Sequence, residues 1–440
     1  MKKVLVLGAG LVAKPLVRYL LDLPDYQVIV ATRTVSKAQD LISGHPRGVA
    51  TSLLVDDSEG LEKMIRDADL VVSLVPYTYH VSIAKICLKH KKHLMTTSYI
   101  SAAMRELDGQ AKAAGLVFMN ELGLDPGIDH MSAMKIIDEV KKGGGAITGF
   151  KSYCGGLPAP EANTNPFGYK FSWSPRGVVM AGRNEAHFLD DGKRVDIPGP
   201  ELFDHHWKVD VPGVAVFEGY PNRDSFPYIE VYGVQGTRTM FRGTLRNEGW
   251  CRAWKKIADM GYLSEAKLDP AGLTYGALTA KLIRSKGADV KSETAAFCGV
   301  PVDSDIISRL AWLGLFGSVP VAPGKDNAMD ILCARLIEKL SYEPGERDMI
   351  VLFHEFTAEY PGGKAQRITS TLLDFGIPNG DSAMSRTVSL PAAIGTKLIL
   401  EGKIARPGVH APTHSEVYLP VLAELESLGV TCKEEWGPKG

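Results

Sequence analysis

The sequence predicts an α/β protein whose first part is a doubly wound parallel sheet. Two observations predict it. Short apolar runs alternate with segments of helical spacing over residues 4–120, and a glycine-rich turn follows the first apolar run directly. The chain has 440 residues. That length exceeds what one compact core usually holds, so we expect two or three domains.

The expected elements of this first sheet follow one another along the chain. Apolar runs predict strands over residues 4–7, 27–31, 70–74, 93–97 and 117–120. Amphipathic spacing predicts helices over residues 11–21, 36–42, 61–67, 81–89 and 102–114. Since parallel strands share one carboxyl edge, where ligands lie in open α/β sheets, polar residues after these strands are site candidates.

The pattern changes after the triple glycine at 143–145. Residues 146–250 carry alternating strands and many turn signals, and apolar residues recur at helical spacing from about 250 to 340. Further strands are predicted over 349–356 and 368–373, and further helices over 390–400 and 418–428.

Composition excludes several classes of function. Apolar residues make up 45% and charged residues 23%, and the net charge of -1 gives no reason to expect nucleic acid or a membrane surface as partner. No run reaches the ~18 to 20 apolar residues of a membrane helix. Six scattered cysteines without a CxxC pair indicate reduced thiols, as in a cytoplasmic protein. His205 and His206 are adjacent and lack the spacing of metal ligands, so we assign no metal.

The turn after the first strand fits the pattern GxGxxA. It reads Gly8, Ala9, Gly10, Leu11, Val12, Ala13. The first glycine permits the tight turn, the second lets a pyrophosphate approach the backbone, and the alanine allows close packing of helix on strand. The N-terminus of the following helix places N–H groups on the phosphates. The pattern therefore predicts a Rossmann domain that binds a dinucleotide.

The end of the second strand indicates which dinucleotide. Arg33 lies 20 residues after Ala13, between Thr32 and Thr34, where an acidic residue would favour NAD. A guanidinium at this place can pair with a 2′-phosphate, so the sequence favours NADP(H). Asp56 or Asp57, after the third strand, is either an adenine contact or a solvated loop acid.

Several unusual segments carry a family resemblance. They are residues 73–77, 96–99, 121–130, 152–160, 169–174, 220–225 and 242–246, and they include GLDPGIDH, SYCGGLPAPE, YKFSWSP and YPNRDS. Together they resemble the saccharopine reductases, which are the glutamate-forming saccharopine dehydrogenases of lysine metabolism, and the matching domain of aminoadipate semialdehyde synthase. The resemblance runs from residue 3 to about 430.

The resemblance implies three parts. A Rossmann domain comprises residues 1–125 and about 385–440, a mixed-sheet α+β substrate domain comprises 126–250 and 341–384, and a helical insert comprises 251–340. These bounds agree with the changes of periodicity described above. Arg33 matches the NADP-using form of the family.

The implied reaction is NADP(H)-dependent reduction of the imine of L-glutamate and 2-aminoadipate 6-semialdehyde to saccharopine, and its reverse. Which direction is physiological stays open. The resemblance places saccharopine on Ser98, Tyr99, Asp125, Arg223, Thr244, Leu245 and Arg246. It places the cofactor also on Val75, Thr97, Ser98, Leu124, Asp125 and Ser174. Guanidinium groups suit a substrate with three carboxylates. Asp125, Tyr99 and Cys154 are the candidates for proton transfer, with Lys170 a further one.

Three alternatives remain at this point. A related imine reductase would act on a diamine, as carboxynorspermidine or homospermidine enzymes do. A semialdehyde dehydrogenase would use Cys154 as nucleophile, with His80 or His130 as a base. A protein that senses NADP(H) without turnover is the third. A homodimer is the default expectation for the assembly.

Overall fold

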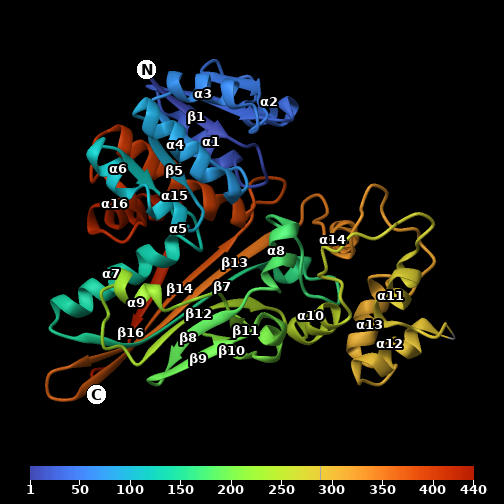
Figure 1. Ribbon diagram of the computed structural model, residues 1–440. Helices are drawn as coiled ribbons and strands as arrows, with labels where there is room; N and C mark the ends of the chain where they lie inside the picture. Colours follow the sequence, from blue (N-terminus) through green and yellow to red (C-terminus); the bar gives the residue numbers. More distant parts are fainter. Residues whose placement is uncertain (288) are drawn as a thin grey trace. The chain divides into compact units, whose positions relative to one another are not determined.

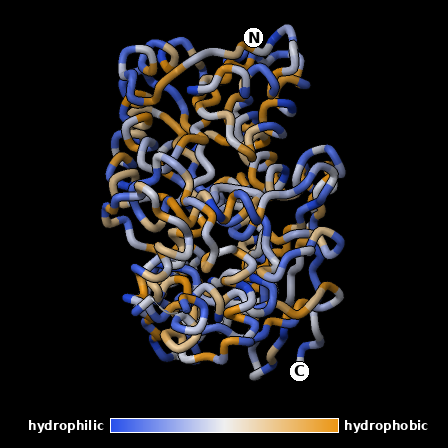
Figure 2. Tube along the Cα trace, turned by 90° about the vertical axis from the view of Figure 1, so that its right-hand side faces the viewer, coloured by the Kyte–Doolittle hydropathy of each residue, from blue (hydrophilic) through white to orange (hydrophobic). Residues whose placement is uncertain are grey.

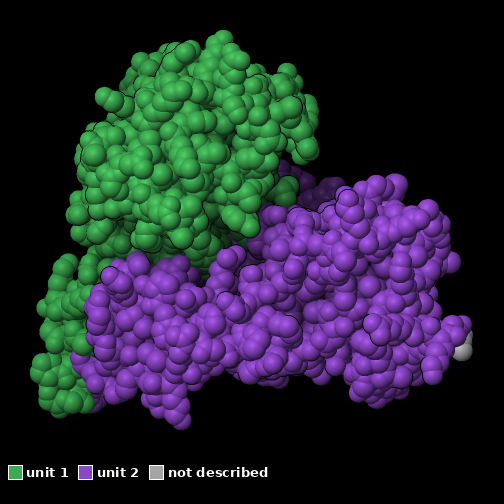
Figure 3. Space-filling model, viewed as in Figure 1, with its two compact units in different colours: residues 1–146, 360–364, 380–435 green, residues 147–359, 365–379, 436–440 purple. Residues whose placement is uncertain are grey.

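The computed structural model describes residues 1–287 and 289–440, and the chain forms two compact units (Figure 3). Unit 1 comprises residues 1–146, 360–364 and 380–435. Unit 2 comprises residues 147–359, 365–379 and 436–440. Both units are therefore built from separate stretches of the chain.

Unit 1 is built on a parallel sheet with the strand order β15-β6-β5-β4-β1-β2-β3 (Figure 1). Its strands are β1 (Lys2–Leu7), β2 (Tyr26–Thr32), β3 (Gly48–Ser52), β4 (Leu70–Ser73), β5 (His93–Thr96), β6 (Val117–Met119) and β15 (Gly408–His410). The order reverses between β1 and β4, and such a reversal opens a crevice at the carboxyl edge. The doubly wound sheet predicted from the sequence is confirmed.

Helices flank this sheet because each has one apolar face. They are α1 (Lys14–Asp22), α2 (Val35–Ile42), α3 (Ser58–Asp67), α4 (His80–His90), α5 (Ala102–Arg105), α6 (Asp108–Ala113), α7 (Ile128–Lys142), α15 (Ala383–Leu400) and α16 (Ser415–Ser427), with a 3-10 turn η1 (Tyr77–Tyr79). The late helix α15 packs on α1, so the end of the chain returns to the first unit.

Three predicted helices differ clearly from the observed ones. The helix expected over 390–400 begins earlier, at Ala383. The helix expected from residue 11 begins at Lys14, because the glycine turn occupies the residues before it and Pro15 suits a first helical turn. The helix expected over 102–114 is two short helices, α5 and α6, separated at Glu106 and Leu107.

Unit 2 is built on a mixed sheet with the path β10-β11-β12-β7-β13-β14-β16, while β8 pairs with β12 and β9 (Figure 1). β12 runs parallel to β7 and antiparallel to β11. The strands of this sheet are β7 (Ala146–Pro158), β8 (Ala186–Asp190), β9 (Lys193–Ile197), β10 (Trp207–Val211), β11 (Ala215–Pro221), β12 (Thr239–Arg246), β13 (Asp348–Tyr360), β14 (Lys364–Phe375) and β16 (Cys432–Trp436). Residues 432–435 of β16 pair in this sheet but are counted with unit 1.

The helices of unit 2 surround a large aromatic and aliphatic core that includes Trp250, Trp254 and Tyr262. They are α8 (Pro175–Ala181), α9 (Pro227–Val231), α10 (Trp250–Asp259), α11 (Tyr275–Ile283), α12 (Val290–Cys298), α13 (Asp305–Trp312) and α14 (Ala328–Lys339), with 3-10 turns η2 (Pro160–Ala162) and η3 (Gly199–Asp204). Figure 2 shows apolar and polar residues interspersed along the whole trace. Within the described residues, no helix is both long and apolar enough to cross a bilayer.

The compact units do not have the domain bounds expected from the sequence. Residues 126–146, expected in the substrate domain, belong to unit 1 because α7 packs on α16. Residues 436–440 belong to unit 2, since the backbone of Gly437 and Gly440 bonds to Arg367 and Ala365 beside β14. The helical segment 251–340 is part of unit 2 and not a separate unit.

Candidate functional site

The glycine turn after β1 has the geometry that a dinucleotide requires. Gly8 has a φ of +106°, and a Cβ on it would lie 3.0 Å from the carbonyl oxygen of Leu74. A side chain is therefore excluded here by conformation and by space. Gly10 has open space where a Cβ would stand, and Ala13 is fully buried against the sheet. These residues fit a pyrophosphate lying against the backbone.

The end of β2 presents the residues expected at the 2′-phosphate. Arg33 and Thr34 are exposed after β2, and the Thr34 hydroxyl does not cap α2 although Thr34 stands at its N-cap position. Asp57 is used locally, since its carboxylate accepts the Gly60 N–H at 3.0 Å at the start of α3. Asp56 is exposed, and it is the acid of this loop that does not cap the helix.

The loops after β5 and β6 bring together two of the predicted catalytic residues. The Tyr99 hydroxyl donates to Oδ1 of Asp125 at 2.8 Å, and both side chains are half-buried. A phenol and a carboxylate joined in this way can hold or pass one proton between them. Thr97 and Ser98 lie on the same loop as Tyr99, and Leu124 is buried beside Asp125. Val75 follows β4 at the same edge of the sheet.

Glu121 holds these two loops together, and sequence reasoning did not single it out. Its Oε1 accepts the Ile100 N–H at 2.8 Å, and its Oε2 lies 2.8 Å from Nε2 of His130. Glu121 has a φ of +57°, a conformation that is rare outside glycine. One buried carboxylate therefore ties the residue after Tyr99 to the helix after Asp125. Its position in the GLDPGIDH segment, directly after β6, was the available signal.

In unit 2 the predicted substrate residues lie on adjacent strands. Thr244 on β12 is the register partner of Cys154 on β7, and Arg246 stands two residues further along β12. Since side chains alternate along a strand, Thr244 and Arg246 share one face. The Leu245 side chain is fully buried in the core, so only its backbone is available to a ligand.

Arg246 is a buried guanidinium without an acidic partner. It is 5% exposed, and within the described residues no carboxylate lies within ion-pair distance of it. Its Nη1 donates to the carbonyl oxygen of Leu245 at 2.8 Å, and its Nε has no partner. Its Cζ lies 4.9 Å from the ring centre of Tyr169, 5.4 Å from Trp250 and 6.0 Å from Tyr220.

The nearest acid to Arg246 in the strand ladder is bound elsewhere. Glu218 on β11 is its register partner, but the Glu218 carboxylate accepts the N–H groups of Gly249 at 2.6 Å and Cys251 at 2.9 Å, at the start of α10. The rings of Tyr169 and Trp250 lie beside the guanidinium, and the Tyr169 hydroxyl and the Trp250 indole N–H are buried without a partner. A buried cation without an acidic partner suits a carboxylate ligand.

Two other predicted residues of unit 2, Arg223 and Lys170, have surroundings that differ from those of Arg246. Arg223 is exposed in the loop after β11 and has a φ of +60°, with its carbonyl accepting the His187 N–H. Lys170 is buried and bonds both carboxylate oxygens of Glu346, at 2.6 and 2.5 Å, so its ammonium is part of an ion pair.

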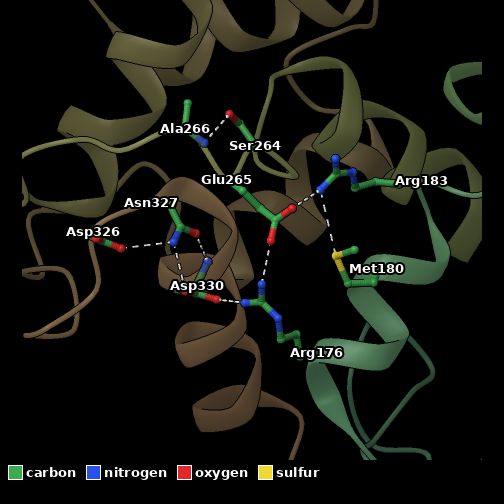
Figure 4. Close-up of polar contacts among 9 residues, drawn as sticks. All are labelled: Arg176, Met180, Arg183, Ser264, Glu265, Ala266, Asp326, Asn327 and Asp330. Carbon is green, nitrogen blue, oxygen red and sulfur yellow. Dashed lines mark hydrogen bonds and ion pairs between the residues drawn. The ribbon is translucent and has the colours of Figure 1, made fainter. Parts of the chain in front are cut away.

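Ser174 caps α8, where its hydroxyl accepts the Gly177 N–H at 3.2 Å. Figure 4 shows how this helix is fixed: Arg176 contacts both Glu265 and Asp330, and Arg183 contacts the other oxygen of Glu265 at 2.7 Å. Exposed ion pairs contribute little singly, but a network of them holds geometry. The network ties α8, and with it Ser174, to α14 and the loop after α10.

The structure thus groups the candidates by unit. The turn after β1, the loops after β2, β4, β5 and β6, and the Tyr99–Asp125 pair lie at the carboxyl edge of the unit 1 sheet. Cys154, Thr244 and Arg246 lie on neighbouring strands of unit 2. Sequence reasoning missed Tyr169 and Trp250, although both fall within segments that it had marked as unusual or helical.

Comparison with known proteins identifies the family of the chain. Residues 4–119 match the family model described as the saccharopine dehydrogenase NADP binding domain, and residues 123–430 match the saccharopine dehydrogenase C-terminal domain. The chain is 44% identical to saccharopine dehydrogenase (NADP(+), L-glutamate-forming) from Schizosaccharomyces pombe, with 99% of both chains covered.

Two further relatives extend the comparison. Bovine mitochondrial alpha-aminoadipic semialdehyde synthase is 38% identical over 98% of this chain and 47% of that protein. The solved structure of apo saccharopine dehydrogenase (L-Glu forming) from Saccharomyces cerevisiae superposes with a TM-score of 0.89 at 41% identity and covers all of both chains. With both family models matched over most of its length, the chain belongs to the saccharopine dehydrogenase family.

Proposed function

We propose that the protein is an NADP(H)-dependent saccharopine dehydrogenase of the L-glutamate-forming type. It oxidises the secondary amine of saccharopine to an imine, and water then cleaves the imine to glutamate and 2-aminoadipate 6-semialdehyde. The reverse reaction joins these two products and reduces their imine. The observation that carries the proposal is Arg246, a buried cation that lacks a carboxylate partner and is surrounded by unused donors.

Binding of the substrate follows from charge. Keeping an unpaired guanidinium buried costs several kcal/mol, and a substrate carboxylate would offset that cost by two parallel hydrogen bonds. The Tyr169 hydroxyl and the Trp250 N–H, both without a partner, are proposed as further donors to this anion. Arg223, exposed after β11, is proposed to bind a second carboxylate, and the Thr244 hydroxyl and Leu245 backbone to add neutral hydrogen bonds.

Unit 1 supplies the cofactor site and the proton chemistry. The backbone of Gly8–Val12 would hold the pyrophosphate, Thr32, Arg33 and Thr34 the 2′-phosphate, and Val75, Thr97, Ser98 and Leu124 the nicotinamide end. When bound, NADP⁺ accepts the hydride from the substrate carbon. Asp125, hydrogen-bonded to Tyr99, is proposed to take the proton that the substrate nitrogen or the attacking water releases.

Cys154 is proposed to line the substrate site without forming a covalent bond. The imine pathway requires no acyl-enzyme, because water and not a thiol attacks the carbon. A Cys154→Ala variant should therefore retain measurable turnover, and the wild-type protein should accumulate no acyl-enzyme. Complete loss of turnover together with trapping of a thioester would favour the semialdehyde dehydrogenase alternative.

The test of the function is a pair of steady-state assays. With saccharopine and NADP⁺, NADPH should form; in reverse, NADPH should be consumed only when glutamate and the semialdehyde are both present. A diamine in place of glutamate should give no turnover, because Arg246 would repel an ammonium group. Turnover with the diamine alone would refute the proposal in favour of the polyamine-type alternative.

We also propose the cytoplasm as location and a homodimer as assembly. Within the described residues, no disulfide bond joins the cysteines, which suits a reducing compartment. Sedimentation of the purified protein would test the dimer, and fractionation of cells that express it would test the location.

A further inference from the structure

Four polar side chains converge behind the loop that carries Ser98. Nδ1 of His80, the first residue of α4, lies 2.9 Å from the Ser73 hydroxyl at the end of β4. Nε2 of His80 lies 2.9 Å from the Ser98 hydroxyl and 3.1 Å from the Thr96 hydroxyl at the end of β5. The backbone N–H of Ser98 donates to the Thr96 hydroxyl at 3.3 Å.

The imidazole in this cluster is neutral. His80 is 4% exposed, and burial lowers the pKa of its ring to about 4. A neutral imidazole has one N–H and one lone pair, so donation at one nitrogen requires acceptance at the other. The direction of the Ser73 hydroxyl and that of the Ser98 hydroxyl are therefore coupled through the ring.

The cluster does not have the form of a proton pathway. Ser73 and Thr96 are fully buried, so hydrogen bonds that start at Ser98 end inside the sheet. Within the described residues, no carboxylate contacts His80, so the ring also lacks the partner that a general base uses. Orientation of Ser98 is the role that the contacts support.

We propose that His80 is a positioning residue whose ring fixes the Ser98 hydroxyl in the direction that cofactor and substrate require. This inference rests on the proposed function, which assigns Ser98 to both ligands. It adds a residue that contacts neither ligand, held at the junction of β4, β5 and α4 where the backbone is rigid.

Two substitutions of similar size test whether His80 orients the Ser98 hydroxyl or only packs in the space behind it. In His80→Gln the side-chain amide reaches the position of Nε2, beside Ser98, whereas in His80→Asn it reaches only the position of Nδ1, beside Ser73. Positioning predicts that His80→Gln retains most of kcat and that His80→Asn loses about three- to tenfold, the value of one neutral hydrogen bond. Equal kcat values, or the reverse order, would overturn the proposal.

A double-mutant cycle gives the second readout. His80→Asn and Ser98→Ala should each lower kcat/KM for saccharopine, and the double variant should lose no more than Ser98→Ala alone, because the ring then has nothing left to orient. If the loss of kcat/KM in the double variant equals the product of the two single losses, His80 has only a structural role and the inference is wrong. His90→Leu, at the far end of α4 and paired with Glu62, serves as the control and should leave activity unchanged.

The outcomes also separate this inference from the function on which it rests. If the wild-type protein does not oxidise saccharopine, the proposed function fails. If it does and His80→Asn is as active as wild type, only the role of His80 fails.

Discussion

Replacing Arg246 by methionine should stabilise the ligand-free protein while it impairs turnover of saccharopine. The guanidinium is 5% exposed and has no acidic partner within the described residues. An uncompensated buried charge costs about 3 to 5 kcal/mol. Cation–π contacts with the three rings around it stabilise the charge by about 0.5 to 1 kcal/mol each. The difference predicts a gain of roughly 0 to 3.5 kcal/mol for Arg246→Met.

The same change removes the proposed charged hydrogen bonds to the substrate. At about 1.5 to 3 kcal/mol, their loss corresponds to a decrease in kcat/KM of about ten- to 150-fold. The NADPH dissociation constant should stay unchanged, because Arg246 is not among the residues proposed to bind the cofactor.

The assay combines melting temperature, kcat/KM for saccharopine at saturating NADP⁺, and NADPH binding by fluorescence. Arg335→Met is the matched control: Arg335 is 6% exposed and stacked 5.1 Å from Tyr275, but it bonds Leu313 and Glu338. This control should lower the melting temperature and leave KM unchanged. If Arg246→Met were destabilising to the same degree and fully active, the reasoning would be refuted.

Three further outcomes are expected. Arg33→Asp should weaken NADPH binding about ten- to 150-fold and NADH binding much less, and equal losses in titrations would contradict the 2′-phosphate role. Asp125→Asn should lower kcat far more than it raises KM; an unchanged pH profile of kcat would exclude Asp125 as the proton acceptor. Since the folded pKa of His80 lies near 4 and an unfolded histidine near 6.5, stability should be complete above about pH 6.5 and fall by about 3 kcal/mol toward pH 4. Thermal unfolding of His80→Gln should not show this loss of stability toward pH 4. The same pH dependence of stability in the variant and in the wild type would contradict the prediction.

The first unit was predictable from sequence because its central strands β1 and β4 are buried on both faces and its turn has a backbone requirement. β1 and β4 read as continuous apolar runs, and Gly8 stands where a Cβ cannot. Arg33 could be found by counting from that turn. These rules use only residues that are close in sequence, so they can be applied to a single sequence without a structure.

The surroundings of the candidate residues could not be predicted in this way. Arg246 was named from a resemblance, but its lack of an acidic partner depends on Glu218 being held by the start of α10, which no local pattern encodes. The extent of unit 1, up to residue 146, likewise depends on distant contacts. Whether α7 belongs to unit 1 is decided by α16, almost 300 positions later in the chain.

The return of the chain to unit 1 has a consequence for biosynthesis. The hydroxyl of Ser389 on α15 donates to the backbone carbonyl of Val12, inside the nucleotide turn, and α15 packs along α1. A ribosome therefore releases the turn long before it has made the helix that supports it, and residues 147–359 and 365–379 of unit 2 are translated in between. The nucleotide turn is thus made early and supported late, and nascent chains should acquire affinity for NADPH only after α15 has been made.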